Sequence, residues 1–302
     1  MRQFAESRAA AVVALAVLSL IWGYNWVVVK ISLSYIGTFQ YLAIRMTLAA
    51  ILLFAIGRLV KLPLALPHPK KTLLLGFLQT TLYGCLMTWA LSRGGAGKVA
   101  VLTFSMPFWM IILAWLFLGE RVRKLQWPII FLAFVGIVCI LEPWQLKSDA
   151  ISNALAISGG IAWALSVLVV KKIQLESPRQ LLALTAWQML FGSVGLIVLA
   201  FVFQTQPIEW GFPLLITFSY SIILSTAAGW ILWTFILQRL PANISGLSTL
   251  AIPVISVLTA WLQLKEAPPR IELAGIFLIA VALGGLALTA GTQKTEPLVE
   301  PS

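Results

Sequence analysis

Pro107 to Arg123 reads PFWMIILAWLFLGERVR, and Pro253 to Arg270 reads PVISVLTAWLQLKEAPPR. In each stretch Ala-Trp follows the proline by seven and eight residues, and a glutamate follows it by thirteen. Residues 96–141 align on residues 242–287 without a gap, and twelve positions are identical, among them the proline, the tryptophan and the glutamate. An apolar segment that begins with proline and occurs twice predicts a chain made of two related halves.

The composition identifies the solvent of this protein. Of its 302 residues, 60% are hydrophobic and 10% are charged, and the mean hydropathy is +0.97. A soluble protein carries about a quarter charged residues, so most of this surface must face lipid. The net charge of +11 is spread in short clusters between apolar runs. Such clusters follow the positive-inside rule and argue against nucleic acid as a partner.

The residues that carry most enzyme chemistry are scarce. His68 is the only histidine and Asp149 the only aspartate, and both lie in polar connectors. Cys85 and Cys139 lie in separate apolar runs, and no phosphate-binding GxxxxGK[ST] motif occurs. We therefore expect no enzyme activity, no metal site and no cofactor.

Ten apolar segments have about the length, roughly 20 residues, that crosses a bilayer as a helix. They cover residues 10–30, 36–57, 72–92, 97–118, 124–142, 150–170, 180–203, 212–237, 241–263 and 270–290. Because each half has an odd number of helices, the second half enters the membrane from the opposite side. The expected fold is an all-α integral membrane protein of two inverted five-helix repeats. The first repeat occupies residues 1–146, the second 147–291, and a disordered cytoplasmic tail 292–302.

The basic residues predict the orientation of these helices. With the N-terminus in the cytoplasm, fourteen lysines and arginines lie on that side and six on the other. The positive-inside rule then places both termini in the cytoplasm of a multi-pass inner-membrane protein.

Residues deep in the segments suggest a substrate cavity. The first, third, fourth, sixth, eighth and ninth segments hold deep polar and aromatic residues, whereas the fifth and tenth are almost wholly aliphatic and should lie at the periphery, with Phe134 and Val281 off the cavity. Ordinary helix packing stays open as the alternative for each cavity residue. The expected cavity residues are Asn25, Trp26, Thr80, Tyr83, Met87, Trp163, Trp187, Gln188, Tyr220 and Trp230.

Several of these segments resemble those of a known family. ALSRGGAGKVAVLTFSMPFWMIILAWLFLGERV and its echo LPANISGLSTLAIPVISVLTAWLQLKEAPP, together with WGYNWVVVK and IRMTLAA, resemble the EamA module of the drug/metabolite transporter superfamily. The tryptophan-rich sequence is most similar to the YddG group of bacterial amino-acid exporters. The resemblance implies ten helices, a central cavity, and export of aromatic or other apolar amino acids and related metabolites.

Five further residues are expected to have gating or structural roles. Arg45 lies within the second segment, where it could receive a substrate carboxylate, snorkel to the surface or satisfy helix-end carbonyls; the family carries arginine there with varied substrates, which favours a structural role. Pro107 and Pro253 should kink their helices. Glu120 and Glu266 end their helices and should pair with a cation or cap another helix.

These observations predict a secondary transporter that exports small apolar or aromatic amino acids by alternating access. The alternatives within the same superfamily are a multidrug, purine or nucleotide-sugar transporter. An alternative from another class is an intramembrane enzyme or receptor, but the sequence contains no catalytic constellation. The expected partners are a small-molecule substrate and the lipid bilayer, with the chain expected as a monomer.

Overall fold

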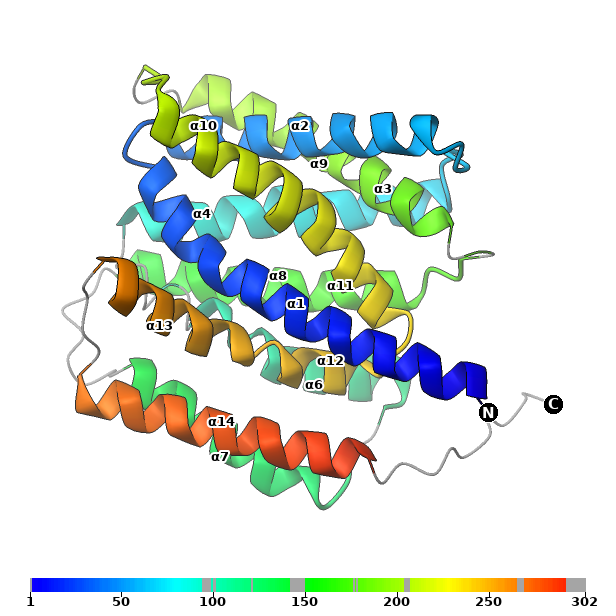
Figure 1. The fold of residues 1–302 in the computed structure, drawn as a ribbon, viewed down its shortest axis with the longest axis vertical. Helices are drawn as coiled ribbons and strands as arrows, with labels where there is room; N and C mark the ends of the chain where they lie inside the picture. The colour runs from blue at the N-terminus through cyan, green and yellow to red at the C-terminus, as the bar shows by residue number, and fades with distance from the viewer. Residues whose placement is uncertain are drawn as a thin grey trace.

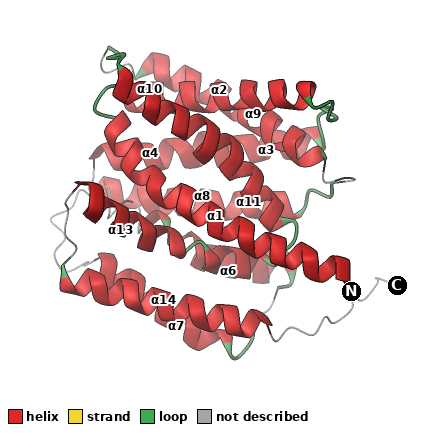
Figure 2. Ribbon diagram, viewed as in Figure 1, coloured by secondary structure: helices red, strands yellow, loops and turns green. Residues whose placement is uncertain are grey.

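The computed structural model describes residues 2–93, 99, 102–120, 122–141, 150–175, 177, 179–203, 207–264 and 269–291. Throughout these residues the regular structure is helical, as Figure 2 shows. The helices lie side by side in Figure 1 and run across the view in both directions.

The first half of the chain forms seven described helical elements. They are α1 (Arg2–Ser32), α2 (Thr38–Leu59), α3 (Pro69–Leu75), the π-helix η1 (Gly76–Leu82), α4 (Tyr83–Arg93), α6 (Met106–Leu118) and α7 (Gln126–Leu141). The second half forms eight, which are α8 (Ala150–Lys171), α9 (Gln180–Val202), α10 (Phe212–Ser219), the π-helix η3 (Tyr220–Ala228), α11 (Gly229–Leu237), α12 (Ala242–Ser248), α13 (Ala251–Leu264) and α14 (Arg270–Gly291).

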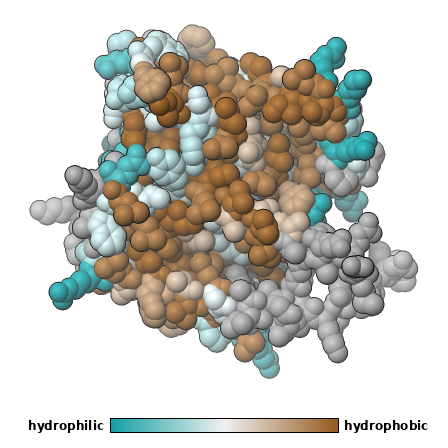
Figure 3. All heavy atoms as spheres, in the orientation of Figure 1, coloured by the Kyte–Doolittle hydropathy of each residue, from teal (hydrophilic) through white to brown (hydrophobic). Residues whose placement is uncertain are grey.

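In the part of the chain that the structure describes, seven helical spans are long and apolar enough to cross a membrane. Three shorter apolar helices, Met106–Leu118, Gln126–Cys139 and Leu273–Gly285, accompany them. Large apolar side chains point outward from these helices; Phe201 and Leu262 are 78% and 80% exposed. Figure 3 shows the hydrophobic surface between hydrophilic groups at the two ends of the visible face. Such a surface suits a lipid environment, and the protein is a multi-pass membrane protein.

The helices of the two halves pack in matched pairs. α1 packs on α13 as α8 packs on α6, and α4 packs on α8 as α11 packs on α1. In the same way, η1 packs on α9 and η3 packs on α2. Two further pairs join a helix to its own counterpart in the other half: α2 with α9, and α7 with α14. Exchanging the two halves leaves this set of helix pairs unchanged.

α7 and α14 lie together at one edge of the bundle, as Figure 1 shows. They form a separate apolar cluster around Ile130, Ala133 and Ile279. Phe134 is 51% exposed and Val281 is 47% exposed. The prediction that the fifth and tenth segments are peripheral is confirmed, because aliphatic side chains without polar groups pack equally well against each other and against lipid.

A turn lies just before the proline at each predicted kink. Residues 104 and 105 form a turn before α6, and residues 249 and 250 form a turn between α12 and α13. Pro107 is the second residue of α6, and Pro253 is the third residue of α13. Proline is tolerated in a first turn because the amide hydrogen it lacks would have no partner there.

Several basic residues gather at one end of the bundle. The Lys71 ammonium donates to the carbonyl of Lys172 at 2.6 Å, and the His68 ring contacts the carbonyl of Gln174 at 2.8 Å. Lys171 donates to the carbonyl of Leu240. The segment before α3, the end of α8 and the end of α11 therefore meet at this end.

Candidate functional site

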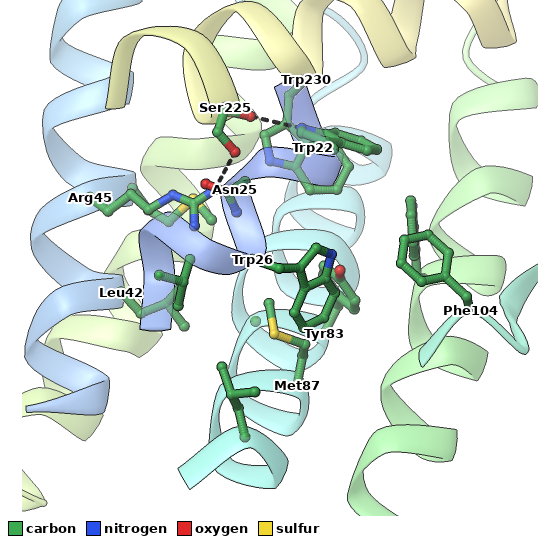
Figure 4. Close-up of a pocket in the computed structure, with 15 residues that line it drawn as sticks. Trp22, Asn25, Trp26, Leu42, Arg45, Tyr83, Met87, Phe104, Ser225 and Trp230 are labelled. Carbon is green, nitrogen blue, oxygen red and sulfur yellow. Dashed lines mark hydrogen bonds between the residues drawn. The ribbon is translucent and has the colours of Figure 1, made fainter. Parts of the chain in front are cut away.

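A cavity lies between the two halves of the bundle, and Figure 4 shows its lining. It contains about 620 Å³ of empty space, part of it open to the outside, of which about 50 Å³ admits the centre of a water molecule. The structure thus holds the cavity in a narrow state with room for a few waters. The lining residues are Trp22, Asn25, Trp26, Val29, Leu42, Arg45, Met46, Tyr83, Gly84, Met87, Leu91, Phe104, Trp163, Ser225 and Trp230.

Aromatic rings from both halves meet at the inner end of this cavity. The ring of Trp22 lies 5.7 Å from that of Trp163, 5.0 Å from that of Trp230 and 6.0 Å from that of Trp233. Tyr83 lies 5.2 Å from Trp163. All four of these pairs are tilted or edge-to-face, and in the edge-to-face pairs the positive edge of one ring meets the negative face of the other. We call Trp22, Tyr83, Trp163, Trp230 and Trp233 the aromatic cluster.

The aromatic cluster closes the cavity toward one end of the bundle. The cavity extends from the cluster toward Val29 and Leu91, near the last turns of α1 and α4. On the other side of the cluster, toward the start of α1, buried apolar side chains pack together. They include Ala11, Ala14, Leu18, Leu53, Val167, Val170, Ile236 and Leu237. The structure is therefore closed toward the end where the basic residues gather.

Hydrogen bonds tie the first two helices of the chain to η3. The Trp22 indole N–H donates to the carbonyl of Ser225 at 2.9 Å, and the Tyr41 hydroxyl bonds the Ser221 hydroxyl at 2.7 Å. A π-helix shifts the backbone pairing by one residue and leaves carbonyls free, and such segments are frequent at functional sites. Here the Ser225 carbonyl of η3 receives a side chain from the opposite half.

Arg45 is the one charged residue in the lining. Its Nε–H donates to the Thr226 hydroxyl, and one terminal nitrogen donates to the Ser225 hydroxyl at 3.1 Å. The guanidinium also lies 5.9 Å from the centre of the Tyr41 ring. Of the roles left open by the sequence, snorkelling is excluded, because Arg45 is only 5% exposed and is bonded to a neighbouring helix.

Six of the ten expected cavity residues do line this cavity. They are Asn25, Trp26, Tyr83, Met87, Trp163 and Trp230. The other four lie elsewhere. Thr80 donates to Gln188 at 3.3 Å between η1 and α9, the Trp187 indole donates to the carbonyl of Leu64 at 2.9 Å, and the Tyr220 hydroxyl donates to the carbonyl of Ile21 at 2.8 Å.

The π-helix explains why Thr80 leaves the expected stripe. The spacing of Thr80, Tyr83 and Met87 predicts one face only if every turn is α-helical. Because η1 ends at Leu82, Thr80 belongs to a π-helical turn, in which each residue rotates through a smaller angle. Thr80 therefore points at Gly192 of α9, whereas Tyr83 and Met87 continue along α4 with Leu91.

The set of cavity-lining helices needs two corrections. The second segment was not expected to line the cavity, yet α2 contributes Leu42, Arg45 and Met46. The ninth segment was expected, but none of its described residues appears in the lining. The reason is that α13 packs against the other side of α1, where Ile255 fills the space next to Gly23.

Sequence reasoning also missed the groups that hold Arg45. Ser225 and Thr226 are small hydroxyl residues in an apolar segment, and both are fully buried. A signal was present, since a buried hydroxyl in a membrane helix needs a partner, but the partner is far away in the sequence.

Glu120 has a structural contact. Its carboxylate accepts a hydrogen bond from the amide of Ala242, the first residue of α12, at 3.0 Å. This is the helix-capping alternative, and the negative charge suits the positive end of a helix dipole. Glu266, its partner in the repeat, lies outside the described residues.

The fold defines a class of protein, a helical multi-pass membrane protein with a cavity between its two halves. The EamA-like transporter family matches residues 9–142 and 150–288, and the chain belongs to this family. It is therefore a transporter and not an enzyme, with the bilayer and a small-molecule substrate as its partners.

Several curated proteins are similar over most of their length. The uncharacterized transporter YoaV of Bacillus subtilis is 26% identical over 82% of this chain and 87% of its own. A probable amino-acid metabolite efflux pump of Salmonella typhimurium is 26% identical over 87% of this chain and 90% of its own. The protein of that name from Escherichia coli is 24% identical over 92% of this chain and 94% of its own. A solved crystal structure with 16% identity superposes with a TM-score of 0.77 over 94% of this chain and 98% of that one, which shows a shared fold.

Proposed function

We propose that this protein is a secondary transporter that exports aromatic and other apolar amino acids and related metabolites across the bacterial inner membrane. Within the family we propose the group of YddG-type amino-acid exporters. The observation that carries the proposal is the cavity at the seam of the two halves, where four tryptophans, one tyrosine and one arginine meet. Flat ring faces suit aromatic and aliphatic side chains, and they attract an ammonium group through cation–π contact.

Alternating access requires a fold that can expose one site to either side. We propose ten spans in two inverted halves, supported by the seven long and three shorter apolar helices and by contacts that survive exchange of the halves. Both termini are proposed to be cytoplasmic, because the basic residues near α3, α8 and α11 share one end. On this reading the described state is closed to the cytoplasm, and its cavity leads outward.

The charge in the lining distinguishes amino acids from the other solutes considered. A cationic drug would be repelled by Arg45, and the lining offers no carboxylate to receive it. A nucleotide sugar would need several basic groups for its phosphates, and the lining has one. The lining also has no Asp, Glu or His to relay protons, so we propose export down the gradient of the substrate.

Counterflow in proteoliposomes tests the proposal. Vesicles loaded with unlabelled phenylalanine should accumulate external radiolabelled phenylalanine, tryptophan and leucine above protein-free vesicles, whereas a labelled organic cation and a labelled nucleotide sugar should stay outside. Further vesicles are loaded with the unlabelled organic cation or the unlabelled nucleotide sugar. Counterflow of either labelled solute into vesicles that hold its own unlabelled form, with no counterflow of amino acids into the phenylalanine-loaded vesicles, would replace the proposal with another substrate class.

A further inference from the structure

The guanidinium of Arg45 is a buried positive charge without a negative partner among the described residues. It contacts two hydroxyl groups and lies over one aromatic ring, and all three groups are neutral. A charge at membrane depth is costly, and neutral hydrogen bonds reduce this cost without cancelling the charge. Among the roles for such a residue, recognition of an anion removes the imbalance directly.

The geometry leaves part of the guanidinium free to bind. Two of its N–H groups are used by Thr226 and Ser225, and a guanidinium carries further donors. Among the residues that the structure describes, the other terminal nitrogen has no hydrogen-bond partner, and it is not fully covered. Its donors therefore open on the cavity. Figure 4 shows Arg45 reaching from α2 toward the cavity while Ser225 holds it from the side.

Asn25 is the other polar group of interest in the lining. Its Oδ1 is fully covered and has no donor, and its side chain lies in the same part of the cavity as the end of Arg45 in Figure 4. Rotation of the carboxamide exchanges its two ends, so the oxygen can turn to face the cavity and accept a hydrogen bond. A ligand with an ammonium group next to a carboxylate would then satisfy both residues.

We propose that Arg45 binds the carboxylate of the transported solute and that Asn25 accepts a hydrogen bond from its ammonium group. The cavity then recognises the zwitterionic end of an α-amino acid, with the side chain against Trp26 and the aromatic cluster. This inference rests on the proposed function and deepens it. Hydroxyl bonds that hold Arg45 in place prepare it for a carboxylate, because little side-chain freedom is left to lose on binding.

A series of four ligands with one side chain tests this without any mutation. L-Phenylalanine carries both charged groups, 3-phenylpropanoate only the carboxylate, phenethylamine only the ammonium group, and L-phenylalaninamide a neutral amide in place of the carboxylate. Titration calorimetry of the purified full chain should show binding of the first two. Loss of the carboxylate should weaken binding roughly tenfold to a hundredfold. Equal binding of phenethylamine, phenylalaninamide and phenylalanine would overturn the inference and leave amino-acid transport standing.

Two variants then assign the groups. Arg45→Gln should abolish the preference for ligands with a carboxylate, and Asn25→Ala should weaken phenylalanine while leaving 3-phenylpropanoate unchanged. Arg58→Gln, at an exposed position in the last turn of the same helix, is the matched control and should bind like the wild type. Melting curves show whether each variant folds. If Arg45→Gln does not fold, the four-ligand titration of the wild-type protein still shows whether the cavity recognises a carboxylate.

The outcomes separate this inference from the proposed function. Arg45-dependent binding of 3-phenylpropanoate without binding of any amino acid would disprove amino-acid export and the role of Asn25, but would keep Arg45 as a carboxylate receptor. Binding of amino acids that Arg45→Gln leaves unchanged would overturn the role of Arg45 alone. Failure of all four ligands to bind would overturn both proposals.

Discussion

Replacement of Trp163 provides the sharpest test of the aromatic cluster. Its side chain is 1% exposed, and its ring lies within 5.2 to 6.3 Å of the rings of Trp22, Tyr83, Phe104, Trp230 and Trp233. Trp163→Ala removes all these contacts and leaves a hole beside the cavity. Large-to-small changes of this kind cost about 3–5 kcal/mol, so we expect both a lower melting temperature and a loss of counterflow.

Trp163→Phe separates function from stability. The indole N–H of Trp163 is buried without an acceptor, so phenylalanine loses no hydrogen bond and keeps a flat ring. The cost should be about 1 kcal/mol from the smaller buried area. We expect this variant to fold normally and to transport a bulky aromatic amino acid with an altered KM, because the surface that the side chain contacts has changed shape.

Trp115→Ala is the matched control, since Trp115 is 59% exposed on α6 and lies outside the cavity lining. Melting curves in detergent and counterflow rates in vesicles should be measured on the same preparations of all three variants. Wild-type counterflow by Trp163→Ala would refute the reasoning. So would a Trp163→Phe variant whose kinetics match the wild type for every amino acid, because Trp163 would then only pack the core.

Three further predictions follow from other parts of the structure. Glu120→Ala removes the acceptor for the Ala242 amide and should lower stability by about 0.5–2 kcal/mol, while Glu120→Gln retains an acceptor and should lower it less; thermal melts of both decide. Gly192→Ala places a methyl carbon 2.3 Å from the Cβ of Thr80 and should lower stability by about 1–3 kcal/mol, whereas Gly284→Ala, with nothing within 4 Å, should be neutral. A reporter fused after Gly291 should be active only in the cytoplasm, and activity only outside would disprove the proposed orientation.

The sequence by itself determined the class of the protein and its two-part construction. Composition alone indicated a membrane protein, because too few charged residues exist to cover a soluble globule. The repeated phrase indicated two halves, since Pro, Trp and Glu recur at fixed spacing and do not arise from apolar composition. The almost wholly aliphatic composition of the fifth and tenth segments predicted that α7 and α14 would lie at the edge. The positions of Tyr83, Trp163 and Trp230 deep within their apolar segments predicted that these aromatic residues line a cavity.

Only the tertiary structure decided which of those residues meet. Thr80 and Tyr83 lie three residues apart, yet they face different neighbours because the π-helix η1 ends between them, and a hydrophobic pattern cannot show that local change of pitch. The partners of Arg45 lie about 180 residues away, so no spacing rule could connect them. The sequence sets what each helix can bury, whereas contacts between distant helices depend on how the two halves pack together.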